Sequence, residues 1–209
     1  MYRSDSRSLS GIGALSNRAA AFRPRGQGRR TMQIAAGYRT PDSADVMAEA
    51  DAHGIAFRRL KELREPLCRD MLAYWNEIRE GRSMPRPDEI DPVRFARYMP
   101  NLLMVQVNWQ PFDLTYRLLG GEVVNAHGAN FRGRRVLDSP SHTGRFNEVL
   151  FAFYKFVAGE KRPYAVCGTM EYVAKGPVEV EAVYLPLSLD GSCTDRILGA
   201  VVSRPLPGK

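Results

Sequence analysis

The final third of the chain contains three stretches that are typical of consecutive antiparallel strands. In "PVEVEAVYLPL", apolar side chains alternate with Glu179 and Glu181, which is the period of a β-strand. "PYAVCGTMEYV" precedes it, and "DRILGAVVS" returns after Asp190-Gly191, a strong hairpin signal. Strands joined by tight turns pair antiparallel, so neither a parallel sheet nor a helical bundle fits this part of the chain. The two glutamates need water or a partner, which predicts that one face of the sheet is exposed at that point.

Two earlier stretches, "NLLMVQVNW" and "DLTYRLLG", are also strand-like and are separated by a "QPF" turn. After them, "GEVVNAHGANFRGRRVLD" has short helical spacing broken by glycines. "SHTGRFNEVLFAFYKFVAGEKR" then has the apolar spacing of an amphipathic helix that stops at Gly159. Together these elements predict an α+β fold, a five-stranded antiparallel sheet with helices packed on one face.

Residues 41–98 are expected to hold helices that precede this sheet. A helix-favouring stretch between Pro41 and Leu63 is weakened in its middle by Gly54. A second helix starts at Pro66, stops at Gly81 and carries an apolar stripe. The stripe, which is our candidate interface with a partner, consists of Leu67, Met71, Tyr74, Trp75 and Ile78.

The stretch "REGRSMPRPDEIDP" follows that helix and predicts a connector of fixed shape. Pro85 and Pro87 fix their own φ angles and bias the preceding residues toward extended backbone. Asp91 with Pro92 then forms a cap and first turn, which predicts a short helix that ends before Pro100.

The basic character of the chain belongs to its first 40 residues. They hold eight arginines and one acid, so their own net charge of +7 equals that of the whole chain. Few large apolar residues occur among them, so we expect a disordered basic tail over residues 1–40. The chain would then continue with helices and the connector at 41–98 and a core at 99–204. The alternatives are an organellar transit peptide and a true translation start at Met32. Association with nucleic acid through this tail is the weakest of our functional hypotheses.

No feature of the sequence indicates an enzyme, a metal site or a membrane protein. His53, His127 and His142 lack metal-ligand spacing, and no nucleophile elbow or phosphate loop occurs. Three scattered cysteines predict neither a disulfide framework nor a redox pair. No run approaches the roughly 18 apolar residues of a membrane helix. We therefore expect a cytoplasmic protein that is not an enzyme.

The order of the elements resembles the PAS fold, and a series of short motifs resembles bacterial single-domain PAS-like proteins. The motifs are Tyr74-Trp75, Gly81-Arg82 with Pro85-Arg86, Ile90-Asp91-Pro92, Tyr116-Arg117-Leu118 with Gly120, Gly128 with Gly133-Arg134, and "LPLSLDG" at 185–191. The resemblance covers about residues 66–202. It implies a stand-alone sensor that holds a small molecule between sheet and helices, pairs with itself or a signalling partner, and changes shape.

Aromatic and polar side chains of this core supply the candidate ligand-binding residues. Tyrosines combine apolar area with hydroxyl groups, which is the mixture that small-molecule sites use. The candidates are Tyr116, Arg117, Val124, His127, Phe131, Arg132, Phe146, Leu150, Phe153, Tyr154, Tyr164, Met170, Tyr172 and Tyr184.

The identity of the ligand stays open, and so does the existence of a pocket. Arg117 and Arg132 are candidates to anchor an anionic ligand, or to form structural ion pairs. His127 is a candidate haem ligand or hydrogen-bonding histidine. "GANFR" has the outline of a flavin photosensor motif, but Phe131 occupies the position that needs a thiol. The alternative function is a pure interaction or dimerisation module whose aromatic core is filled.

Overall fold

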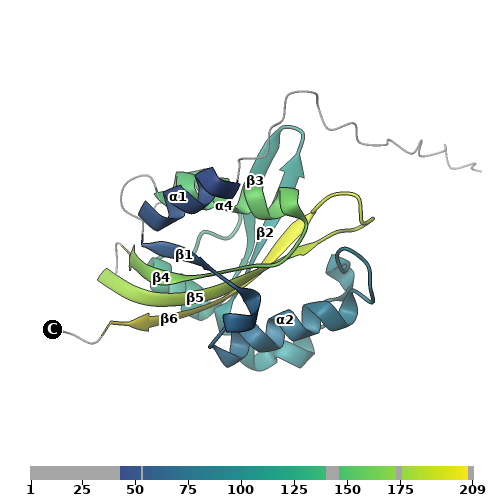
Figure 1. Ribbon diagram of the computed structural model, residues 1–209, viewed down its shortest axis with the longest axis horizontal. Helices are drawn as coiled ribbons and strands as arrows, with labels where there is room; N and C mark the ends of the chain where they lie inside the picture. Colours follow the sequence, from purple (N-terminus) through teal and green to yellow (C-terminus); the bar gives the residue numbers. More distant parts are fainter. Residues whose placement is uncertain (1–42, 53, 140–145, 173–175, 207–209) are drawn as a thin grey trace, which may run out of the picture. The chain divides into compact units, whose positions relative to one another are not determined.

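A six-stranded antiparallel sheet organises the protein, whose computed structural model describes residues 43–52, 54–139, 146–172 and 176–206 (Figure 1). The strand order is β1-β4-β5-β6-β2-β3. The strands are β1 Ile55–Arg58, β2 Leu102–Trp109, β3 Phe112–Leu119, β4 Tyr164–Tyr172, β5 Gly176–Leu187 and β6 Arg196–Pro205. The predicted basic tail lies outside the described residues.

The five predicted strands are confirmed, and so is the α+β class. β4 pairs with β5, β5 with β6, β6 with β2, and β2 with β3, all antiparallel. Along β5 the side chains of Val178, Val180, Ala182 and Tyr184 share one face of the sheet and join one buried core, as their alternation predicts.

The sixth strand corrects the prediction for the N-terminal region. The helix-favouring stretch forms a short helix, α1 Ser43–Ala52, and then the chain turns into β1, which pairs with β4. Gly54 has φ +76°, a conformation that residues with a side chain rarely adopt, so it ends the helical course. The backbones of Gly54 and Gly168 approach so closely that a Cβ on Gly168 would lie 2.0 Å from the Gly54 carbonyl oxygen. Glycine at both positions therefore permits this strand to join the sheet.

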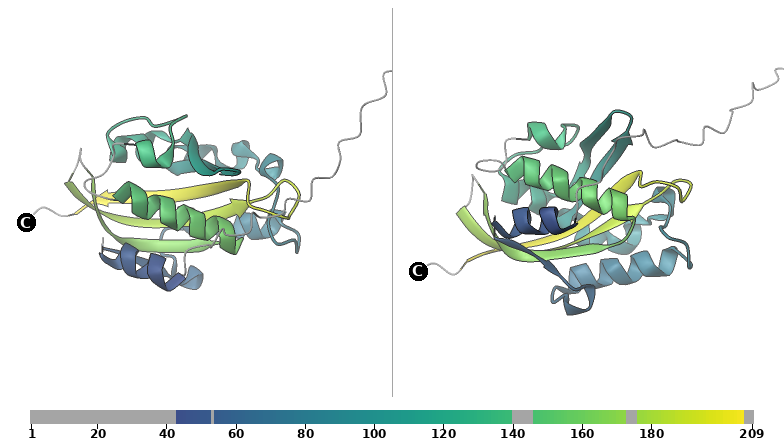
Figure 2. Two further views of the ribbon diagram at one scale, coloured as in Figure 1. Left: turned by 90° about the horizontal axis from the view of Figure 1, so that it is seen from above. Right: turned by 45° about the horizontal axis from the view of Figure 1, so that its top comes forward.

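Helices cover both faces of the sheet, not one face as predicted. The inner face carries α1, α3 Gly121–His127 and α4 Phe146–Glu160. The outer face carries α2 Pro66–Ile78 and η3 Pro92–Asn101, a 3-10 helix (Figure 2). Central strands buried on both faces need cover on each side. On β5 and β6 the outer-facing Val183, Leu185, Leu198 and Ala200 are as buried as the inner-facing residues.

The apolar stripe of α2 packs against the sheet of its own chain. The side chains of Leu67, Met71, Tyr74 and Trp75 are 0–6% exposed, and only Ile78 is partly exposed. Trp75 Nε1 donates a hydrogen bond of 2.8 Å to the Pro186 carbonyl oxygen. The structure thus assigns this stripe to the intramolecular core, which corrects its prediction as an interface with a partner.

The connector after α2 has a defined shape. It includes the 3-10 helix η2 Pro87–Glu89, and it is tied to α2 by Tyr74. The Tyr74 hydroxyl donates to the Glu89 carbonyl oxygen at 2.9 Å and accepts from the Asp91 backbone N–H at 2.8 Å. Arg82 donates to the Ile78 carbonyl oxygen at 2.7 Å and to Glu89 Oε2 at 2.9 Å. η3 continues through Pro100 to Asn101.

Candidate functional site

A small cavity lies between α4 and the inner face of the sheet. Its volume is about 40 Å³, room for about two or three water molecules. One side of the cavity is formed by α4, because residues of this helix at three- and four-residue spacing face the sheet. The lining residues are Ala50, Ile55, Leu103, His127, Phe146, Val149, Leu150, Phe153, Tyr154, Val166, Met170, Val180, Tyr184 and Val201.

Tyrosine hydroxyls provide polar groups in the otherwise apolar wall of this cavity. Tyr154 is 1% exposed and interacts through its hydroxyl with Tyr116 and Tyr184. Burial, together with these two neighbouring tyrosines, raises the pKa of Tyr154 well above its usual value. The group is therefore a neutral hydroxyl at any physiological pH, available as a donor or an acceptor.

His127 ends α3 and lines the same cavity. Its side chain is 9% exposed, and its ring meets Phe131 edge-on with 5.8 Å between the ring centroids. Burial lowers the pKa of His127 to about 4. The imidazole is therefore uncharged at neutral pH and brings no positive charge to the cavity.

The structure brings half of the predicted ligand-binding residues to the cavity wall. Those that line it are His127, Phe146, Leu150, Phe153, Tyr154, Met170 and Tyr184. Tyr116 and Phe131 lie just behind the wall, in contact with Tyr154 and His127 respectively.

The other predicted residues lie elsewhere. Arg117 and Arg132 are exposed, so neither lies where it would anchor an anion in this cavity. Tyr164 packs on Phe57 and Phe156, and its hydroxyl donates to Glu160 at 3.0 Å. Val124 is half-buried outside the lining. The side chain of Tyr172 lies outside the described residues.

Sequence reasoning missed half of the wall. Val166 and Val180 alternate with correctly predicted neighbours on β4 and β5, so strand periodicity alone would have found them. Leu103 and Val201 follow from the same rule once β2 and β6 are known to be adjacent. Ala50 and Ile55 gave no such signal, because they belong to α1 and β1.

The comparison with protein families settles what kind of domain encloses this cavity. The model of one family, described as PAS domain, matches residues 63–202. The chain belongs to the PAS domain family. No curated protein matches the chain. PAS domains are in general sensory, regulatory or interaction modules, and they are typically not enzymes. The part of this PAS domain that the structure describes includes no helix able to cross a membrane.

The cavity extends beyond the segment that matches the PAS family. α1 and β1 end at Arg58, before the match begins at residue 63. They nevertheless contribute Ala50 and Ile55 to the cavity wall, and Phe57 packs edge-on against Phe153 of α4 at 5.7 Å. We call residues 43–58 the N-terminal strap, since they close the PAS core along its β4 edge.

A buried carboxylate fastens α2 and the strap to the outer face of the sheet. Glu181 is 7% exposed, and its Oε1 accepts from the backbone N–H groups of Arg64 and Glu65 at 2.8 and 2.7 Å. Its Oε2 accepts from Arg58 of β1 at 2.6 Å. Glu181 therefore holds the backbone immediately before α2, at Arg64 and at the cap residue Glu65. Glu179 is thus exposed to water and Glu181 has a partner, the two alternatives that the sequence left open, but the sheet face is not exposed at Glu181.

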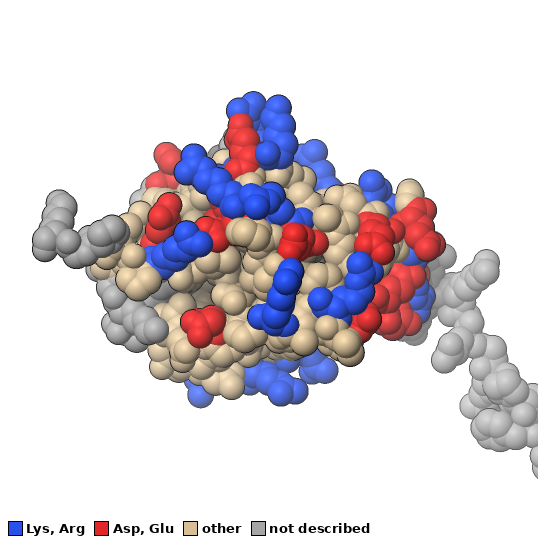
Figure 3. All heavy atoms as spheres, turned by 90° about the horizontal axis from the view of Figure 1, so that it is seen from below, with Lys and Arg blue, Asp and Glu red and all other residues tan. Residues whose placement is uncertain are grey.

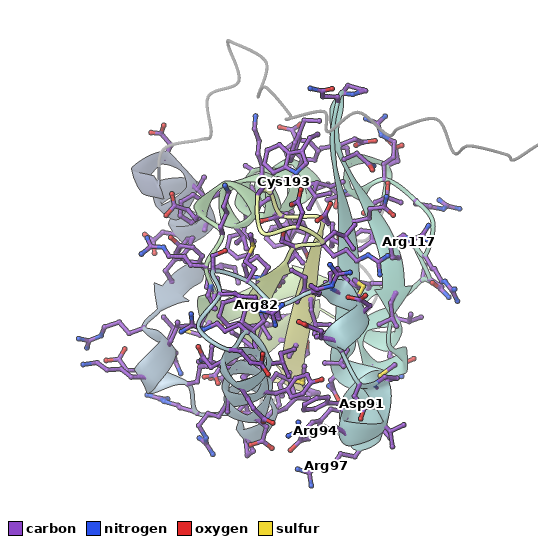
Figure 4. The ribbon with its side chains drawn as sticks, turned by 90° about the vertical axis from the view of Figure 1, so that its right-hand side faces the viewer. Arg82, Asp91, Arg94, Arg97, Arg117 and Cys193 are labelled. Carbon is purple, nitrogen blue, oxygen red and sulfur yellow. The ribbon has the colours of Figure 1, made fainter. Side chains whose placement is uncertain are left out.

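The three cysteines are free thiols. Cys68 is buried between α2 and the sheet, and burial raises its pKa to about 12. Cys193 lies in the β5–β6 loop (Figure 4) with Asp190 and Asp195, and their ligand atoms lie within 4.8 Å of one another. Asp190 accepts from the Ser192 backbone N–H at 2.8 Å, and Asp195 accepts from that of Leu189 at 2.6 Å. These contacts explain both carboxylates as parts of the loop.

Proposed function

We propose that this PAS domain is a sensor that binds a small, uncharged, largely apolar molecule between α4 and the sheet. The observation that carries this proposal is the chemistry of the wall. Its described residues include no Lys, Arg, Asp or Glu, while Tyr154, Tyr184 and His127 add neutral polar atoms. Apolar lining with a few placed polar groups is the usual composition of small-molecule sites. A charged ligand would lose its hydration on entering the cavity and would find no opposite charge in the wall, which is energetically costly.

The small size of the cavity gives the binding event a structural consequence. A volume of about 40 Å³ is far below the roughly 300–1,000 Å³ of pockets for drug-sized ligands. A larger ligand must therefore displace α4 or the N-terminal strap from the sheet. The strap carries Arg58, the ion-pair partner of Glu181, so its displacement loosens the contact that holds α2. We propose this displacement as the signal that a partner protein detects.

Native mass spectrometry of the full chain purified from its native host tests the proposal. We expect an additional mass that denaturation releases. Val180→Phe places a larger side chain in the cavity and should abolish that mass, whereas Val202→Phe, which lies on the outer face, should retain it. A bare chain in all three preparations would contradict ligand binding.

A pure interaction module is the second candidate, and the nearly filled cavity favours it. The aromatic rings of Phe153, Tyr154 and Tyr184 pack together with centroid distances of 4.9–5.8 Å. If this is a finished core, Val180→Phe should only lower stability by overpacking, by about 1–3 kcal/mol. Under the sensor proposal, the same substitution also removes the response to ligand. Light scattering measures the molar mass of the protein in solution. Comparing the protein before and after the bound molecule is removed shows whether self-association is part of that response.

Nucleic-acid association stays a prediction that concerns the basic tail alone. On the face of the described region that carries α2, Lys and Arg side chains alternate with Asp and Glu (Figure 3). A surface of mixed sign does not produce the extended positive field that attracts a phosphate backbone. Equal, salt-insensitive affinity for DNA with and without residues 1–40 would exclude a role of the tail.

A further inference from the structure

The outer face of the sheet contains a second recess, separate from the cavity under α4. It lies where α2, the connector and η3 meet β2, β3 and β6, and its volume is about 160 Å³. A cavity of about 150 Å³ lined by apolar side chains suffices to bind a benzene ring. We call this recess the outer groove. It is lined by Met71, Pro87, Ile90, Pro92, Phe95, Met99, Leu102, Met104, Leu118 and Leu198.

Two arginines flank the outer groove and carry uncompensated charge. Arg196 of β6 has its Nη1 3.9 Å from the sulfur of Met104, a lining residue. On β3, Leu118 pairs with Met104 and Tyr116 with Val105, so Arg117 is the extra residue at this irregularity and directly precedes Leu118, which lines the groove. Within the described part of the chain, neither guanidinium forms an ion pair.

The other arginines of this region differ in this respect. Arg94 of η3 forms a two-fold contact with Glu77 at 2.9 and 3.0 Å, and Arg97 pairs with Asp70 at 3.3 Å. Figure 4 shows Arg117 on the β3 side, and Arg94 and Arg97 at η3. The unpaired positive charge is therefore confined to the β3 and β6 side of the groove. Beyond Pro92, Val93 is 80% exposed and continues the apolar surface.

We propose that the outer groove docks a segment of a partner protein that inserts one aromatic side chain and places acidic residues beside it. The volume of the groove fits one ring, and buried aromatic anchors dominate the energy of many interfaces. Charge complementarity requires carboxylates opposite Arg117 and Arg196. The same requirement excludes the chain's own residues 1–40 as the occupant, because they carry eight arginines and one acid.

Selection of short random peptides, displayed on phage, against the full chain tests this proposal. Enriched peptides should carry an aromatic residue flanked by Asp or Glu, and their affinity should fall as salt is added. Arg117→Glu and Arg196→Glu should each weaken binding about tenfold or more. Arg132→Glu, an exposed arginine outside the groove, is the matched control and should leave affinity unchanged. Enriched peptides without acidic bias, or equal affinity for all four proteins, would overturn the proposal.

Methionine methyl NMR locates the bound peptide independently of these variants. Met71, Met99 and Met104 line the outer groove, whereas Met170 lines the cavity under α4. The best peptide should shift the methyl signals of Met99 and Met104 and leave that of Met170 in place. A shift of Met170 alone, saturation by indole without any peptide binding, or self-association through this face would each replace the proposed occupant with another and refute it.

Discussion

Single buried polar side chains are the reason why we propose neutral molecules as ligands of this PAS core. His127 and Tyr154 are both taken out of water, and burial moves the pKa of each away from the charged form. Burial lowers the pKa of a histidine and raises that of a tyrosine for the same reason, the cost of removing a charge from water. The cavity is therefore polar without being charged.

The buried state of His127 predicts how stability depends on pH. In the unfolded chain the imidazole binds a proton near pH 6.5, whereas the folded protein resists protonation down to about pH 4. Protons thus favour the unfolded chain between these values, and the free energy of unfolding should fall as the pH is lowered through this window. The loss should be on the order of 2 kcal/mol.

Urea unfolding at a series of pH values measures this effect. His127→Phe removes the titrating group, so its stability should change less between pH 6.5 and 4 than that of the wild type. Identical slopes in the two proteins would show that His127 is not protected from protonation.

Removal of the Tyr154 hydroxyl tests the tyrosine contacts. Tyr154→Phe should lower the free energy of unfolding by about 1 kcal/mol, because the hydroxyls of Tyr116 and Tyr184 lose a buried partner. Tyr164→Phe, at a half-exposed position, is the control and should cost less. In a double-mutant cycle, Tyr154→Phe and Tyr184→Phe should be less than additive. Full additivity would argue against a coupled pair.

At the level of elements, β5 connects the cavity under α4 with the outer face of the sheet. Val180 faces the cavity under α4, and its neighbour Glu181 faces the start of α2. Successive residues of a strand point to opposite faces, so one strand contacts both the cavity and the helix on the outer face. The N-terminal strap adds a second connection, since Ile55 lines the cavity and Arg58 pairs with Glu181.

Loss of the Glu181 carboxylate should destabilise the protein strongly. Glu181→Ala leaves Arg58 and two N–H groups at the start of α2 without their partner, and breaking a buried ion pair costs about 3–5 kcal/mol. Glu179→Ala, two residues earlier on the same face but exposed, should change stability by less than about 0.5 kcal/mol. Urea denaturation compares the two variants. Equal effects would mean that Glu181 does not hold α2.

The attachment of the strap depends on a close backbone contact. Gly168→Ala places a methyl group against the Gly54 carbonyl, so β1 should separate from β4. Amide hydrogen exchange should then accelerate at residues 55–58 while the β2–β3 pair stays protected. Gly121→Ala, which has open space around its Cβ, is the control and should leave exchange at β1 unchanged. Unchanged protection in Gly168→Ala would contradict the contact.

At the scale of the whole molecule, the sequence predicts the antiparallel sheet because period and turns agree. The alternation in β5, the hairpin at Asp190-Gly191 and the spacing of α4 are all local signals. The second helical layer could not be predicted this way. Whether the stripe of α2 covers its own sheet or a partner depends on the chain path, and the apolar outer faces of β5 and β6 are the indications that it covers the sheet. The sequence does not predict β1, because this strand has only four residues and directly follows a helix-favouring stretch.

The same limit applies to the candidate site. Aromatic residues such as Phe153 and Tyr184 were predictable, because they recur on the buried faces of strong elements. Arg117 is exposed because it follows the inward-facing Tyr116 on β3, and successive residues of a strand point to opposite faces. Long-range pairing, which brings Ile55 next to Gly168, determines the rest of the wall.

Methionine methyl NMR with a neutral probe tests the central claim most directly. 4-Ethylphenol combines an apolar body with one hydroxyl, and 4-ethylbenzoate has the same body with a negative charge. We predict that 4-ethylphenol shifts the methyl signal of Met170, which lines the cavity, whereas 4-ethylbenzoate leaves that signal in place. Equal shifts of Met170 with both compounds, or no shift with either, would contradict a receptor site for uncharged molecules under α4.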